Sequence, residues 1–263
     1  MANAEIILPL ALPVMTLSAL GTAAGFDVAY VANDHPGVVY KSAGGVASGY
    51  IQLDFGVDVS ISRLMLFGII GAPGAATFKV YSSTQAQGAT YAGWVSAAVP
   101  LYAGSNRLQT GAGVGYLAIA APASRYWRVE FAGLANAQVT IGRLVLGQHL
   151  ALQRNFSFGG EFGIRDFSSS DFSARGNFLR RRGRKLRTCA ISFPASYRDE
   201  IEEQIAPLLQ RAGGDGPVAL IIDPAAHGMR ERRCFFGPMI GTAPATWRNA
   251  QRWEWRADLV SLF

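Results

Sequence analysis

The stretch over residues 178–224 constrains the fold most, because it holds the clearest helix of the chain between two strand-like segments. After Gly183, polar and apolar residues alternate as far as Phe193, which is typical of a half-buried strand. An apolar stripe at helical spacing follows over residues 201–209, and the short apolar run over residues 218–222 ends at a turn. The stretch therefore predicts strand, helix, Gly-rich turn and buried strand.

The ends of this helix are marked by residue type. Ser196 is a good N-cap, and Asp199 three residues later would close a capping box, so we expect a helix over residues 196–212. Pro194 is expected to end the preceding strand. Pro207 is expected to kink or shorten the last turn, because it has no N–H to donate.

A dense cluster of positive charge leads into the strand, and it comprises Arg180, Arg181, Arg182, Arg184, Lys185 and Arg187. Three interpretations stay open: a solvated strand face that pairs with the acidic start of the helix, a contact surface for another subunit, or a nucleic-acid site. The last is the weakest, because such sites usually interleave aromatic stacking residues and no such pattern is found close by. A terminal run over residues 252–260 alternates cleanly, and its Trp253 and Trp255 are assigned with the cluster to a subunit interface.

Composition favours two β-rich domains. The 263 residues include 30 glycines, and only 16% are charged, below the roughly 25% of an ordinary soluble domain. Residues 1–150 carry a net charge of +1 and residues 151–263 a net charge of +5, which places a boundary near residue 150. A surface short of charge suggests burial in an assembly.

Cysteine usage and the N-terminus bear on location. Cys189 and Cys234 are expected to be buried free thiols, which fits folding in a reducing cytoplasm. Residues 6–20 are apolar, but they lack a basic flank and contain Pro9 and Pro13, so we expect neither a signal peptide nor membrane insertion. We expect an ordered, partly buried N-terminal segment.

The first half contains about eight short strand-like runs separated by turn residues, and no helix. They lie at residues 26–31, 38–40, 50–56, 61–70, 77–82, 116–120, 126–131 and 139–146. This spacing favours a β-sandwich or jelly roll. The predicted class is mainly β: an N-terminal β-sandwich jelly roll followed by a second β-sandwich or barrel domain with one flanking α-helix.

The order of several degenerate motifs resembles the discoidin, or galactose-binding-like, jelly roll. The motifs are an Asn33-Asp34 turn, YIQLDFG at 50–56, ISRL at 61–64, FKVYSS at 78–83 and YWRVEF at 126–131. The resemblance implies a domain over residues 1–147 that binds sugars through loops at one end. It also implies a structural calcium, for which Asp34 is the one matching position, although the fuller acidic loop is missing. No other cofactor is expected.

Sugar binding needs an aromatic platform with polar groups beside it. Tyr40, Tyr91 and Trp94 are the candidates, the last two in a Gly-rich loop. The alternative for Trp94 is a place in the core or in an interface.

The layout of residues 148–263 resembles tail-tip and distal-tail-type proteins of long-tailed bacteriophages. In that family a small β domain with one flanking helix assembles into a ring that continues the tail tube. The resemblance implies a virion tail protein whose partners are copies of itself, other tail proteins and a host surface glycan. Nucleic acid is not an expected partner.

No catalytic motif accompanies the three histidines, His35, His149 and His227, so we expect no enzyme. Three functions are kept. The first is a structural tail-tip component, and the second is a carbohydrate-binding accessory module of a cell-wall-acting system. The third is a nucleic-acid-binding protein.

Overall fold

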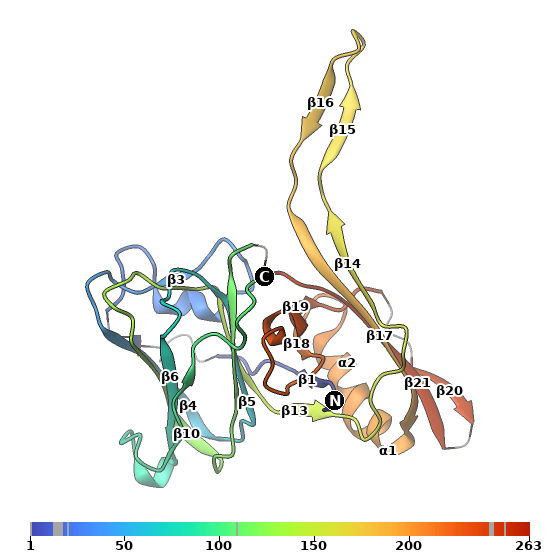
Figure 1. Cartoon of the computed structure of the whole chain (residues 1–263). Helices are drawn as coiled ribbons and strands as arrows, with labels where there is room; N and C mark the ends of the chain where they lie inside the picture. Colours follow the sequence, from blue (N-terminus) through green and yellow to red (C-terminus); the bar gives the residue numbers. More distant parts are fainter. Residues whose placement is uncertain (1, 13–17, 20, 109, 242–244, 250) are drawn as a thin grey trace. The chain divides into compact units, whose positions relative to one another are not determined.

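The computed structural model describes residues 2–12, 18–19, 21–108, 110–241, 245–249 and 251–263, which form two compact units (Figure 1). Unit 1 comprises Met1–Ala151, Val218–Cys234 and Phe263, and unit 2 comprises Leu152–Pro217 and Phe235–Leu262. The second domain expected over residues 148–263 is therefore not continuous. Its apolar strand β18 (Pro217–Ile221) pairs with β1 (Glu5–Ile7), whose other edge pairs with β13 (His149–Ala151).

Unit 1 is an antiparallel β-sandwich. Its larger sheet has the order β2-β4-β10-β6-β7, with β8 also paired to β6, and its smaller sheet has the order β12-β5-β9. The bounds in the larger sheet are β2 Ser18–Ala19, β4 Ser48–Val59, β10 Ser124–Ala132, β6 Thr77–Ser83, β7 Trp94–Val95 and β8 Val99–Pro100. In the smaller sheet they are β12 Arg143–Gly147, β5 Arg63–Ile69 and β9 Gly113–Ala118, and β3 (Tyr40–Lys41) pairs separately with β11 (Thr140–Ile141). The mainly β class is confirmed.

Alternation along the strands explains why the two sheets pack together. In β10, Trp127, Val129 and Phe131 point into the core and are at most 5% exposed. Leu64 and Leu66 of β5 belong to the same apolar cluster and are fully buried. A strand repeats every two residues, so the residues between those of β10 must face outward.

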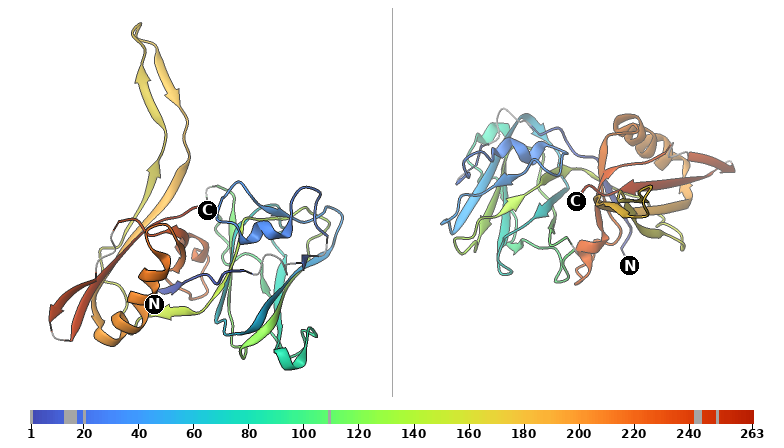
Figure 2. Two further views of the ribbon diagram at one scale, coloured as in Figure 1. Left: turned by 180° about the vertical axis from the view of Figure 1, so that it is seen from behind. Right: turned by 90° about the horizontal axis from the view of Figure 1, so that it is seen from above.

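Unit 2 is built on a four-stranded antiparallel sheet of order β14-β17-β21-β20. The strands are β14 Glu161–Asp166, β17 Lys185–Tyr197, β21 Arg252–Val260 and β20 Ala245–Asn249; β19 is Cys234–Pro238. β14 and β17 continue outward into a hairpin of β15 (Ser169–Phe172) and β16 (Phe178–Arg181), which projects beyond the sheet (Figures 1 and 2). The alternation predicted after Gly183 is confirmed, with Cys189, Ile191 and Phe193 buried.

The prediction that Pro194 ends the strand before the helix is wrong. β17 continues through Pro194 to Tyr197, and its register with β21 shifts between Phe193 and Ser196. A bulge of this kind leaves a residue outside the ladder, where the missing N–H of proline costs little.

The helix of unit 2 begins later than expected. It runs as α1 (Arg198–Glu200), a π-helical turn η4 (Ile201–Ile205) and α2 (Ala206–Ala212). Ser196 lies in β17, and the capping acid is Glu200, whose Oε2 accepts from the N–H of Tyr197 at 2.9 Å. The wide turn ends one residue before Ala206-Pro207, and the missing N–H of Pro207 interrupts the regular bonding pattern there. Pro207 lies at the start of α2 and does not shorten its last turn, which continues to Ala212.

Short 3-10 segments complete the described structure: η2 (Val28–Ala32), η3 (Gln85–Gln87) and η5 (Arg230–Arg233). Of the predicted apolar N-terminal segment, residues 5–7 form buried β1, while residues 13–17 and 20 lie outside the described residues. No helix in the described part of the chain is long and apolar enough to cross a membrane.

Candidate functional site

The outward face of the larger sheet of unit 1 carries three rows of polar and aromatic side chains across β4, β10 and β6. The rows are Asp54, Tyr126 and Ser83; Gln52, Arg128 and Tyr81; and Tyr50, Glu130 and Lys79. Directly opposite residues of antiparallel strands share a face, so each row brings its members together.

Arginines lie over the rings of this face. The guanidinium carbon of Arg128 is 4.2 Å from the ring centre of Tyr50 and 5.9 Å from that of Tyr81. The guanidinium of Arg125 is 4.9 Å from the ring centre of Tyr126. These cation–π contacts hold the rings in position, and every one of these side chains remains partly exposed.

The positive charges on the face are balanced locally. Arg125 forms a two-pronged ion pair with Asp54, with distances of 2.6 and 3.0 Å, and Arg128 pairs with Glu130 at 3.0 Å. The hydrogen bond from Arg125 lowers the pKa of Asp54 below its usual value, and the N–H of Gly56 contributes in the same direction. The face therefore presents polar groups with little net charge.

Tyr91 joins the same face from the loop between β6 and β7. Its backbone φ of 54° lies in the left-handed region, which is uncommon for a residue with a side chain. Its N–H donates to Oγ of Ser83 at 3.2 Å. Burial raises the pKa of the Tyr91 phenol, and Arg128 opposes this shift from close by. We define the tyrosine face as Tyr50, Tyr81, Tyr91, Tyr126 and Arg128.

The other two predicted glycan-binding residues do not join this face. Tyr40 is 3% exposed and belongs to the core cluster, so it offers no ring to a ligand. Trp94 pairs with Ser82, whose neighbours on that side are core residues, and its partly buried ring packs against the core. Its core alternative is the one that the structure supports.

The carboxylate of Asp34, the position suggested for calcium, forms an ion pair with an arginine of the protein itself. The carboxylate lies 2.9 Å from Nε of Arg143, a buried arginine that needs a counter-charge. Among the described residues, no group of three His, Cys, Asp or Glu side chains could hold a metal ion. The position that resembled a calcium ligand thus serves to balance an arginine.

The predicted interface residues divide into two sets. Arg184 donates to the carbonyl of Leu262 at 2.9 Å, Lys185 lies 3.6 Å from Asp166, and Arg187 lies over Phe235. These three are held within unit 2. By contrast, Arg180, Arg181 and Arg182 are exposed on the hairpin, with no ion pair to any described residue.

The predicted interface tryptophans are not free surface residues. Trp255 is fully buried and stacks on Phe193, with ring centres 5.1 Å apart. Trp253 is partly buried and stacks on Trp247, with ring centres 5.4 Å apart. The expectation for Trp255 is wrong because its side of β21 faces the core of unit 2.

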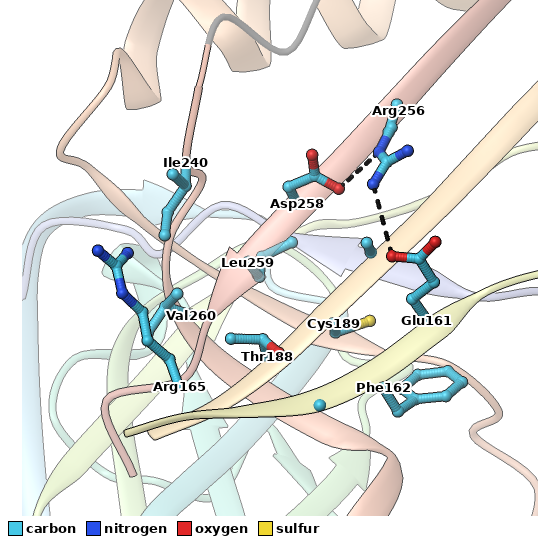
Figure 3. Close-up of a pocket in the computed structure, with 12 residues that line it drawn as sticks. Glu161, Phe162, Arg165, Thr188, Cys189, Ile240, Arg256, Asp258, Leu259 and Val260 are labelled. Carbon is cyan, nitrogen blue, oxygen red and sulfur yellow. Dashed lines mark hydrogen bonds and ion pairs between the residues drawn. The ribbon is translucent and has the colours of Figure 1, made fainter. Parts of the chain in front are cut away.

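A hollow of about 400 Å³ lies on unit 2 (Figure 3). Small residues of the sheet, Gly163, Thr188 and Ala190, contribute to its lining, and charged side chains stand around them. Arg256 contacts Asp258 at 2.8 Å and Glu161 at 3.9 Å, so these three charges are paired locally. Arg165 also lines the hollow, and its guanidinium lies 5.1 Å from the ring centre of Phe167.

No protein-family model and no curated protein matches the chain. Partly similar solved structures include chitosan-binding module 1 of a chitosanase/glucanase from Paenibacillus sp. IK-5, with 17% identity and a TM-score of 0.38. CBM32-3 of a family 31 glycoside hydrolase from Clostridium perfringens has 13% identity and a TM-score of 0.39, and a fucose binding module from Streptococcus pneumoniae has 12% and 0.38. Each covers 54% of this chain, and the matches span 98%, 96% and 95% of those chains, respectively. At these TM-scores the likeness establishes neither a family nor a ligand.

Proposed function

We propose that the protein is a non-catalytic saccharide-binding protein whose unit 1 binds its ligand on the tyrosine face. The observation that carries this proposal is the gathering of four partly exposed tyrosines around Arg128 on one sheet surface. Tyrosine offers a rigid apolar ring and a polar hydroxyl, so it binds ligands that have both kinds of surface.

The chemistry of the face favours a neutral saccharide over other ligands. A sugar ring presents a C–H surface that packs on an aromatic ring, with hydroxyl groups at its rim. Gln52, Glu130 and Lys79 lie beside the tyrosines and can bond such hydroxyls. A nucleic acid would favour a surface with excess cations, whereas here two carboxylates pair with two arginines.

The proposal is tested by screening the full chain on a glycan array and titrating the best neutral oligosaccharide by calorimetry. Replacing Tyr81 or Tyr126 with alanine removes a contact ring, and we expect binding to weaken about tenfold, equivalent to about 1.4 kcal/mol. Phenylalanine at the same positions keeps the ring and should lose less. Tyr30→Ala, in η2, is the matched control and should bind like the unaltered chain.

Two results would count against the proposal. One is the absence of binding to any neutral glycan by a folded chain. The other is binding that survives both alanine variants but is lost on Trp94→Ala, which would place the site elsewhere. Incubation of the bound glycan with the protein should leave it uncleaved, and a hydrolysis product would contradict the non-catalytic role.

A second candidate function is assembly through unit 2, as in the phage tail-tip proteins that residues 148–263 resemble. The specific observation is the hairpin, whose large apolar side chains are mostly exposed to solvent. Phe172 is 67% exposed, Phe178 59% and Leu179 53%. Apolar side chains gathered in this way mark a surface that another molecule covers. Light scattering after size exclusion should then show an oligomer of the full chain.

A further inference from the structure

The hairpin segment of residues 167–184, which we call the arm, has unsatisfied charge as well as exposed apolar side chains. It contains five arginines and one acidic residue, Asp171. Arg175, Arg180, Arg181 and Arg182 are exposed, and none has an ion pair with a described residue. Cations this close repel one another unless a negative partner approaches.

The arm is also short of structural support. Among the described strands, β15 and β16 pair only with each other, and a two-stranded ribbon alone is marginally stable in water. The rings of Phe172 and Phe178 lie 5.5 Å apart at paired positions and cover one another only in part. A partner that fits the arm must therefore combine negative charge with some apolar contact.

The complementary surface is present in unit 2 itself. The first turns of the helix expose Asp199, Glu202 and Glu203, and of these only Glu202 has an ion pair among the described residues, with Arg198. We call these three residues the acidic helix face. Ala206 and Pro207, which follow it, are partly exposed.

The sequence allows the arm and the acidic helix face to pair within one chain, but the structure keeps them apart. In unit 2 the hairpin leaves one end of the sheet, while α1 lies at the other end, as two opposite views show (Figures 1 and 2). The arm and the acidic helix face are close in sequence but are therefore far apart in space within a single copy.

We propose that the arm of one copy binds the acidic helix face of a second copy. This inference rests on the second candidate function, assembly through unit 2, and names the contact that would produce it. The two surfaces differ, so the contact is head-to-tail and generates a ring or a filament rather than a two-fold dimer.

The test uses the full chain and light scattering after size exclusion. Reversing the arm with Arg180→Glu, Arg181→Glu and Arg182→Glu should raise the dissociation constant at least tenfold. Reversing the acidic helix face with Asp199→Lys, Glu202→Lys and Glu203→Lys should do the same. Mixing the two variants restores opposite charges at every contact, so the oligomer should return.

Controls separate charge at this contact from charge in general. Arg211→Glu, Arg232→Glu and Arg248→Glu change the same number of exposed cations outside the arm and the tyrosine face and should leave the oligomer intact. Lysines in the first helical turns oppose the helix dipole. If that variant fails to fold, Asp199→Asn, Glu202→Gln and Glu203→Gln replace it and should weaken assembly without reversing charge.

The outcomes are distinguishable. An oligomer that survives both reversals leaves assembly standing and overturns the arm-to-helix contact. A chain that is monomeric at every concentration overturns both. Binding of duplex DNA that is lost on arm reversal, with an unchanged oligomeric state, would show instead that the arm binds nucleic acid. None of these results bears on the separate proposal that unit 1 binds a glycan.

Discussion

At the scale of single residues, Asp54 shows how the tyrosine face is held together. Arg125 lowers its pKa below the usual value of 3.8, so the ionised carboxylate is stabilised in the folded state. A depressed pKa contributes stability above the unfolded value, and that contribution is lost as pH falls through the folded pKa. The contribution is small because both side chains are partly exposed.

Asp54→Asn should therefore lower the urea midpoint of unfolding modestly at pH 7, by removing the charge that pairs with Arg125. As the pH falls through the lowered folded-state pKa of Asp54, the unaltered carboxylate becomes neutral and the unfolding midpoints of the two proteins should converge. Urea titrations at pH 7 and over a falling series of acidic pH values check this. A difference that is as large at low pH as at pH 7 would show that the pair contributes by packing alone.

A second prediction at this scale concerns the reactivity of the two cysteines. Cys189 and Cys234 are free thiols that are at most 1% exposed, as the sequence indicated. Burial raises the pKa of Cys189 to about 12, so little of the reactive thiolate exists near neutral pH. We expect no reaction with Ellman's reagent at pH 8 in the native state and two reactive thiols per chain in guanidinium chloride. Rapid native labelling would contradict the buried positions.

At the scale of elements, Glu200 joins the helix to the chain that precedes it. Its carboxylate is 5% exposed and accepts from the N–H of Tyr197 at 2.9 Å and from that of Gln153 at 2.6 Å. Glu200→Ala should destabilise the protein by about 1–3 kcal/mol, because two backbone donors lose their partner. Chemical denaturation measures the loss. Glu202→Ala, two residues away and exposed, is the control, and an equal loss there would refute the capping role.

At the scale of the whole molecule, binding and assembly are assigned to different units. The tyrosine face lies in unit 1 and the arm in unit 2. We therefore expect Tyr126→Ala to weaken glycan binding about tenfold per site without changing the oligomeric state. The arm reversal should dissolve the oligomer and leave the affinity per site within about twofold. Calorimetry with a soluble glycan, together with light scattering on the same samples, would show any coupling between glycan binding and assembly.

The sequence alone determined most strands of unit 1 and their inward faces, although the run expected as a strand over residues 26–31 forms the 3-10 segment η2 instead. Alternation of apolar and polar residues sets which side of a strand is buried, and so Trp127 and Val129 were placed correctly in a strand with one apolar face. The same alternation turns Tyr126, Arg128 and Glu130 outward. The sequence analysis nevertheless selected only Tyr91 of the tyrosine face, because pattern alone does not say which strands are neighbours.

Only the tertiary structure decided which strands pair with one another. Strand order brought Tyr50, Tyr81 and Tyr126 onto adjacent strands, and pairing of β7 turned Trp94 toward the core. Pairing of β18 with β1 likewise moved Val218–Cys234 into unit 1. Local sequence sets the period and burial of each element, whereas hydrogen bonding between distant strands depends on the whole chain. That is why the elements could be predicted and the site required the fold.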